Sequence, residues 1–196
     1  HRPSTAGVVI DTTAPAVAGT VTVPLPGTYV AGQNLHFVVS FDENVTVDGD
    51  SSTLGLTVGT ATRSAAFLSA EGNTVTYRSI VQAGDLDANG IEVGAIALGT
   101  STIRDAAGND AVIALAGHVP PTSAILVDGT VPVVSGTIAA PADKTYTVGE
   151  QLAFTVTFDE NVTVTGTAST LGLDIGGAPR SAVYDSKTAN SITYVY

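Results

Sequence analysis

One stretch of this chain occurs twice, almost unchanged. Residues 35–47 read LHFVVSFDENVTV and residues 152–164 read LAFTVTFDENVTV, so residue 35 matches residue 152 at an offset of 117. The same offset relates Tyr77 to Tyr194, and no gap is needed anywhere along the overlap. Roughly half of the overlapping positions are identical, which indicates tandem duplication of a 117-residue repeat.

Apolar and polar side chains alternate along each copy of this stretch. Successive side chains of a β-strand point to opposite faces, so the alternation predicts a half-buried strand that ends in the acidic turn at residues 42–44. Abundant Val and Thr, with 21 Gly and 9 Pro, favour short strands and tight turns. We therefore expect an all-β fold of tandem immunoglobulin-like β-sandwich modules. Strands are expected at residues 8–10, 17–23, 35–41, 45–47, 54–58, 63–68, 74–78, 91–98, 111–115 and 125–127, with turns or loops at 71–73, 82–90 and 104–110.

The offset also predicts the domain boundaries. Residues 1–11 align with residues 118–128, so we interpret them as the tail strand of a preceding repeat. Residues 12–128 then form one complete repeat, and residues 129–196 form a second repeat that is incomplete. Three explanations of the incomplete repeat are open: a window cut from a longer repetitive protein, a proteolytic product, or completion by strand addition from another copy.

The charge of the chain excludes two classes of partner. It carries 18 Asp plus Glu against 7 Lys plus Arg, a net charge of −11, whereas nucleic acid and anionic membrane surfaces attract basic proteins. No apolar run is long enough to predict a membrane-spanning helix. The three histidines show no catalytic or metal-binding spacing, and the chain has no cysteine, so we do not expect an enzyme.

The sharpest candidate metal site is the loop at residues 84–92, which reads GDLDANGIE. Oxygen-bearing side chains at Asp85, Asp87 and Asn89, followed by glycine, resemble the first half of a calcium loop. Glu92 is a further candidate ligand in place of the glutamate that such loops carry at their twelfth position. The alternative is a polar turn in which Asp and Asn side chains bond to their own backbone.

A second set of acids follows the duplicated strand. Asp42 and Glu43 of the first repeat should lie at its N-terminal end, together with Asp11 and the turn that contains Asp105, for which a secondary ligand role is open. The Asp85 loop should lie at the opposite end. There it would approach the linker between the two repeats and the turn that follows the duplicated strand in the second repeat. The polar residues at this joint are Asp128, Asp159, Glu160 and Asn161. We expect calcium to bind there and to stiffen the joint. Solvated turn caps are the alternative.

Four motifs resemble the bacterial immunoglobulin-like tandem repeats of very large surface and secreted adhesins, of the biofilm-associated and RTX-adhesin type. They are IDTTAP at residues 10–15, FDENVTV at 41–47, VQAGDLDANGI at 81–91 and IRDAAGN at 103–109. The resemblance implies an extracellular, cell-surface location, a role in adhesion or biofilm, and calcium at loops or junctions. Gly129 departs from the pattern, because the first linker has Thr12 at that position.

These observations favour a structural extender module of an adhesin fibre, rigidified by calcium. Its expected partners are neighbouring repeats, other copies through strand addition, and an unknown surface ligand. The alternative is a binding module that recognises a glycan or a host protein through its loops.

Overall fold

The structure, a computed structural model, describes Gly7 and residues 10–196. This part of the chain is all-β and contains no helix, so none that could cross a membrane. The chain divides into two compact units, His1–Thr130 and Val131–Tyr196.

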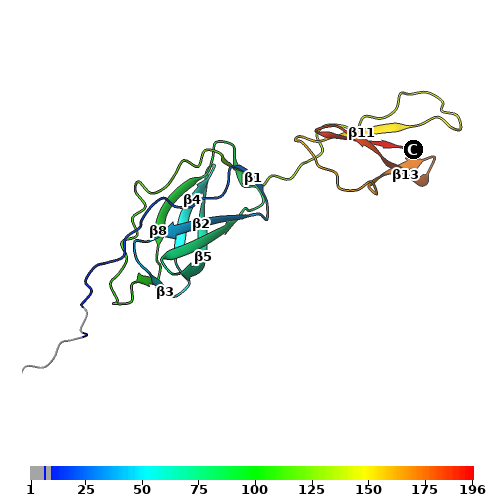
Figure 1. Cartoon of the computed structure of the whole chain (residues 1–196). Helices are drawn as coiled ribbons and strands as arrows, with labels where there is room; N and C mark the ends of the chain where they lie inside the picture. The colour runs from blue at the N-terminus through cyan, green and yellow to red at the C-terminus, as the bar shows by residue number, and fades with distance from the viewer. Residues whose placement is uncertain (1–6, 8–9) are drawn as a thin grey trace, which may run out of the picture. The chain divides into compact units, whose positions relative to one another are not determined.

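Half of the strands of the first unit belong to one antiparallel sheet of five strands, in the order β2-β6-β5-β4-β8 (Figure 1). The parallel pair β1-β10 with antiparallel β7 forms a second sheet, and β3 pairs with β9 in a third. The strands are β1 Gly27–Val30, β2 Asn34–Ser40, β3 Thr46–Asp48, β4 Thr53–Val58, β5 Ala61–Glu71, β6 Thr74–Ile80, β7 Leu86–Asp87, β8 Glu92–Ala97, β9 Thr102–Arg104 and β10 Ile125–Asp128.

The core of the first unit confirms the predicted alternation of β2. Leu35, Phe37 and Val39 are at most 1% exposed, while His36 on the other face is exposed. Tyr77 of β6 is fully buried, and its hydroxyl lies 2.9 Å from the buried hydroxyl of Ser52. The predicted turn at residues 71–73 joins β5 to β6, with Gly72 at a φ of 57°.

Two predicted strands of the first unit were wrong. Residues 17–23 and 111–115 form only isolated bridges, among them those of Val17 with Phe41 and of Ala16 with Val112. The first segment buries Val21 and the second buries Leu115. The apolar residues of these segments thus pack against the core without forming a continuous strand ladder. Two short strands were not predicted: β1 follows the prolines Pro24 and Pro26, and β7 lies in the segment expected to be a loop, residues 82–90. Of the strand predicted at residues 8–10, only Ile10 lies within the described residues.

The second unit contains one antiparallel sheet of four strands, in the order β11-β14-β13-β12. These are β11 Ala153–Thr157, β12 Thr170–Ile175, β13 Ala178–Lys187 and β14 Ser191–Val195. Its buried apolar cluster comprises only Val156, Ala182, Ile192 and Tyr194.

The strand registers of the two sheets match at the offset of 117 found in the sequence. Phe37 lies opposite Tyr77 as Phe154 lies opposite Tyr194. The bulge of β5 between Phe67 and Ser69 has its counterpart in β13 between Tyr184 and Ser186. The Ser52–Tyr77 hydroxyl pair likewise recurs as Ser169 with Tyr194, at 3.1 Å.

Phe37→Ala and Phe154→Ala should therefore differ in cost although the two residues occupy matching positions. Phe37 is fully buried, so its truncation should destabilise the first unit by about 3–5 kcal/mol. Phe154 is only partly buried, so its truncation should cost the second unit about 1–2 kcal/mol. Hydrogen exchange of the Val39 and Val156 amides in the full chain measures each unit separately. Equal losses would contradict this difference in packing.

Candidate functional site

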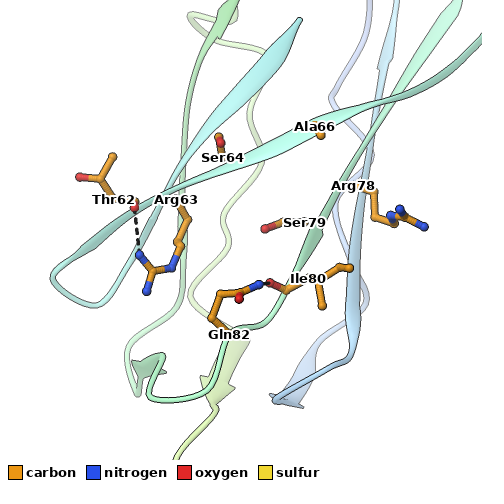
Figure 2. Close-up of a pocket in the computed structure, with 8 residues that line it drawn as sticks. All are labelled: Thr62, Arg63, Ser64, Ala66, Arg78, Ser79, Ile80 and Gln82. Carbon is orange, nitrogen blue, oxygen red and sulfur yellow. Dashed lines mark hydrogen bonds between the residues drawn. The ribbon is translucent and has the colours of Figure 1, made fainter. Parts of the chain in front are cut away.

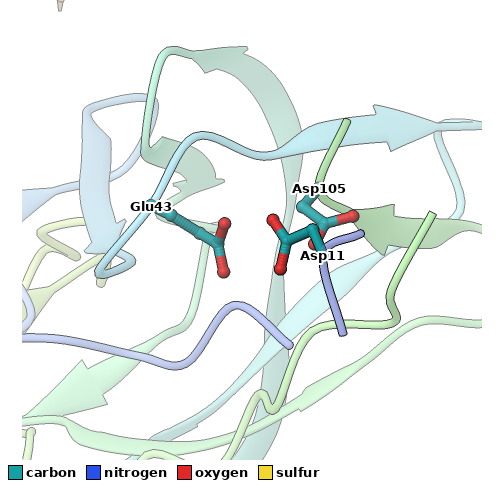
Figure 3. A group of neighbouring side chains, drawn as sticks. All are labelled: Asp11, Glu43 and Asp105. Atoms are coloured by element: carbon teal, nitrogen blue, oxygen red, sulfur yellow. The ribbon is translucent and has the colours of Figure 1, made fainter. Parts of the chain in front are cut away.

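Three acidic side chains meet at the end of the first unit where β3 pairs with β9. Asp105 directly follows β9, Glu43 lies in the turn after β2, and Asp11 precedes the linker. One carboxylate oxygen from each lies within 4.8 Å of the other two, and Figure 3 shows the three groups turned toward one another. We call Asp11, Glu43 and Asp105 the acidic triad. Among the described residues it is the one group of this kind.

Asn109 fixes this arrangement. Its side-chain amide donates to the Asp105 carboxylate at 2.7 Å and to the backbone carbonyls of Asp11 and Thr13 at 3.3 and 3.0 Å. Its backbone N–H donates to the other Asp105 oxygen at 2.8 Å. One residue therefore ties the linker to the loop that follows β9.

Asp42 fixes the linker on its other side. Its carboxylate accepts from the Ala16 N–H at 2.8 Å, and its own N–H donates to the Ala16 carbonyl at 3.0 Å. The Asp11 carboxylate accepts from the Thr13 N–H at 3.0 Å and so caps its own turn. The hydrogen bonds between Asp42 and Ala16, together with the bond from Asn109 to the Asp11 carbonyl, thus hold two of the predicted acids, Asp11 and Asp42, at the same end of the unit.

The triad concentrates negative charge. Desolvation, together with the charges of Asp11, Asp105 and Asp42, raises the pKa of Glu43. Burial alone would also raise the pKa of Asp105, which is 7% exposed, but hydrogen bonds from Asn109 and from neighbouring backbone N–H groups lower it. No ion pair of the described residues involves these three acids. The geometry thus favours a cation beside Glu43.

The donor set indicates which cation would fit. All three ligand groups are carboxylates, and hard cations such as Ca²⁺ prefer oxygen ligands, whereas zinc and copper favour imidazole and thiolate. Asp11 and Glu43 were predicted as ligands, and the prediction that Asp105 lies at the same end of the repeat is confirmed.

The loop at residues 84–92 differs from the calcium loop that its sequence resembles. Asp85 is 3% exposed, and one of its carboxylate oxygens accepts from Nε and Nη2 of Arg63 at 3.0 and 2.6 Å. Its other oxygen accepts from the Gln82 N–H at 2.9 Å. The internal guanidinium thus occupies the position beside Asp85 that a cation would take.

Asp87 adopts the alternative that the sequence left open, a turn that bonds to its own backbone. One oxygen accepts from the N–H groups of Asn89 and Gly90, at 3.1 and 2.8 Å, and the other from Gly59 at 2.7 Å. Asn89 is exposed, and Glu92 is an exposed residue of β8, so the described structure does not gather these side chains around one point.

The Asp85 loop does pack against the joint, as expected. Gly84 and Asp85 exchange backbone hydrogen bonds with Gly129, at 2.8 and 2.6 Å. A Cβ at Gly129 would lie 2.3 Å from the Gln82 carbonyl, which explains why this linker has glycine where the first has Thr12.

The remaining predicted ligands cap turns or lie in the second unit. Asp128 accepts from the N–H and the hydroxyl of Thr130, and Asp159 accepts from the Val133 N–H at 2.8 Å. Glu160 is partly buried and Asn161 is exposed. A cation shared between the two repeats stays a prediction.

A separate open cavity of about 530 Å³ lies where β5 and β6 diverge (Figure 2). β6 pairs with β5 only as far as Ala66 and Arg78, and beyond that point the two strands separate. Six of the eight residues that line it are polar, among them Arg63, Arg78, Ser79 and Gln82. Arg63 is paired with Asp85, whereas Arg78 is exposed.

Comparisons of the chain with protein-family models, with curated proteins and with solved structures found no match.

The sequence patterns predicted only a secondary ligand role for Asp105 and did not single out Asn109. The available signal was the spacing Asp105-x-x-x-Asn109 around Gly108, which has a φ of 94°. This tight turn lets Asn109 bond back to Asp105.

Arg63→Ala should destabilise the first unit by about 2–3 kcal/mol, because it leaves the Asp85 carboxylate buried without its cation. The figure is below that for fully buried pairs, since the Arg63 side chain is 36% exposed. The matched control is Arg180→Ala in the second unit, where Arg180 donates, within the described part of the chain, only to the Pro179 carbonyl and should contribute little. Denaturant unfolding measures both, and an equal loss in the two variants would contradict the structural role of Asp85.

Proposed function

We propose that this chain is a structural extender of a bacterial surface or secreted adhesin fibre, built of consecutive immunoglobulin-like modules. The observation that carries the proposal is the agreement of strand order and register between the two units at the 117-residue offset. Stacked copies of one unit are the architecture of arrays that span distance. A ligand-binding head is more often a unique domain.

The composition supports an exposed, extended polymer. A net charge of −11 keeps such a polymer soluble and disfavours nucleic acid. The four motifs named above resemble adhesin repeats, and they include the DENVT turn and the DAAGN turn that supply Glu43 and Asp105. We place the protein outside the cell on this basis, with neighbouring repeats as its main partners.

Calcium, in this proposal, binds Asp11, Glu43 and Asp105. The ion would neutralise three carboxylates that repel one another. Asp11 belongs to the chain that enters the unit, whereas Glu43 and Asp105 belong to its folded body. Binding would therefore restrain the entering segment and stiffen the start of the module.

The second candidate function is recognition of an acidic glycan or a host protein. The cavity between β5 and β6 favours it, because the exposed Arg78 lies there in an otherwise acidic chain. Binding to immobilised acidic saccharides that is lost in Arg78→Ser would favour this function over the extender.

Calcium should raise the thermal stability of the first unit. A ligand that binds only the folded state stabilises it by about 2.7 kcal/mol at a hundredfold excess over Kd. Asp105→Asn and Glu43→Gln should abolish this increment, which calorimetry of the full chain with calcium or with chelator measures. Glu71→Gln is the control, because Glu71 is an exposed acid of the same unit that belongs neither to the acidic triad nor to the predicted ligands of the joint.

The calcium-free chain gives an independent check. The pKa of Glu43 is raised above its ordinary value of 4.5, so the folded state binds this proton more tightly than the unfolded state does. The stabilisation that this proton provides is therefore lost as pH rises through the pKa of Glu43 in the folded state, and Glu43→Gln should remove that loss.

An unchanged calcium increment in both triad variants would contradict the proposed site.

A further inference from the structure

The open cavity of about 530 Å³ splits the five-stranded sheet of the first unit between β5 and β6 (Figure 2). β5 pairs with β6 as far as Ala66 and Arg78, and beyond that pair β5 stays with β4 whereas β6 stays with β2. The split is therefore closed at Ala66 and Arg78 and widens from there toward Gln82. An extended chain in the plane of the sheet can enter it only by its end. We call this site the β5–β6 cavity.

The hydrogen bonds on the far side of each strand show which backbone groups face the cavity. The Phe67 N–H of β5 donates to the Ser52 carbonyl on the β4 side. Alternate residues of a strand bond to opposite neighbours, so Ser64 turns its N–H and C=O toward β6. By the same rule Ile80 of β6 faces β5, because the next residue, Val81, bonds to the segment that enters β2. Neither Ser64 nor Ile80 has a partner in the ladder between β5 and β6.

Side chains occupy two carbonyl groups at this split. Gln82 Nε2 donates to the Ile80 carbonyl at 2.7 Å, and Arg63 Nη1 donates to the Thr62 carbonyl at 3.2 Å; Figure 2 shows the second of these bonds. Two acceptors are thereby used, whereas the N–H groups of Ser64 and Ile80 have no ladder partner. The cavity thus offers more donors than acceptors.

Ser79 adds a hydroxyl to these donors. This residue is only 9% exposed, and its side chain makes no hydrogen bond with the described part of the chain. No fully buried side-chain oxygen of the described residues lacks a partner, so the Ser79 hydroxyl must reach open space. Figure 2 shows it directed into the gap between the two strands.

The charge of the lining has the opposite sign to the charge of the chain. None of the lining residues is acidic, although the whole chain has a net charge of −11. Arg63 is paired with Asp85. Arg78, at the closed end, is exposed, and its side chain forms no ion pair or hydrogen bond with the described residues. Excess donors and an unpaired guanidinium favour an anionic oxygen ligand.

We propose that the β5–β6 cavity binds the free carboxyl end of an extended polypeptide. The last peptide residue would pair with the N–H and C=O of Ser64, as a short added strand. Its terminal carboxylate would accept from the Ile80 N–H, the Ser79 hydroxyl and the Arg78 guanidinium. A peptide fits better than a saccharide, because Ser64 presents the donor and acceptor pair of a β-ladder. The inference rests on the second candidate function, recognition of a protein, and is independent of calcium.

NMR titration of the full chain with acetylated trialanine tests the proposal. The peptide with a free carboxyl end should shift the amide resonances of Ser64 and Ile80. The same peptide with a C-terminal amide should bind about tenfold more weakly, because hydrogen bonds to a charged group are the stronger ones. Equal binding of the two peptides, or no shift with either, would overturn the proposal.

Two variants identify the groups that hold the carboxylate. Arg78→Gln and Ser79→Ala should each weaken binding of the free-acid peptide about tenfold. Arg104→Gln is the matched control: it removes the same charge from an exposed arginine outside the cavity and should bind as the wild type does. An equal loss in Arg104→Gln would show general attraction to a cationic chain segment and would reject the site.

Glucuronate distinguishes a saccharide from a peptide, because it has a carboxylate but no peptide backbone. It should bind more weakly than the free-acid peptide. Tighter binding of glucuronate at the Ser64 and Ile80 resonances would assign the cavity to an acidic saccharide and reject the peptide. All titrations contain chelator, so a failure here leaves the calcium increment of the first unit, and with it the extender function, to be judged separately.

Discussion

The ladder formed by β2, β6 and β5 is the constraint on which the rest of the first unit depends. It places Phe37 opposite Tyr77 in a core that excludes water, and the Tyr77 hydroxyl reaches Ser52 across that core. Burial raises the pKa of Tyr77, although the Ser52 hydrogen bond opposes the shift, so the phenol stays neutral at ordinary pH. The second unit has the same ladder, with Phe154 opposite Tyr194 and Ser169 bonded to Tyr194, although its side chains are less buried. The ladder is therefore the part of the fold that the repeated sequence specifies most strongly.

The ends of strands in the first unit determine where its acidic groups lie. β2 ends beside Asp42 and Glu43, and β9 ends beside Asp105, so two turns of one unit bring their acids to the same place. The entering chain is then held there by Asp42 and Asn109, which adds Asp11. At the other end, Arg63 neutralises Asp85 internally. The two acidic motifs thus differ in their charge balance, because only Asp85 has a paired guanidinium.

Alternation and repetition in the sequence were sufficient to predict an all-β chain and most of its strands. They failed at residues 17–23, where Val21 is buried without a continuous ladder, since burial alone does not require strand pairing. The Asp85 loop resembled a calcium site because spacing records which oxygens are near in sequence, whereas the position of Arg63, 22 residues earlier, is set by the fold. Asp105 was predicted to have only a secondary ligand role, because its proximity to Asp11 spans most of the repeat and depends on Asn109.

The position of a bound ion tests the account most directly. Crystals of the full chain grown with terbium in place of calcium would give an anomalous signal wherever the hard cation binds. The account predicts a peak among Asp11, Glu43 and Asp105, with Arg63 still paired to Asp85. A peak at Asp85, Asp87 and Asn89 with Arg63 displaced, or no peak near the triad, would contradict it.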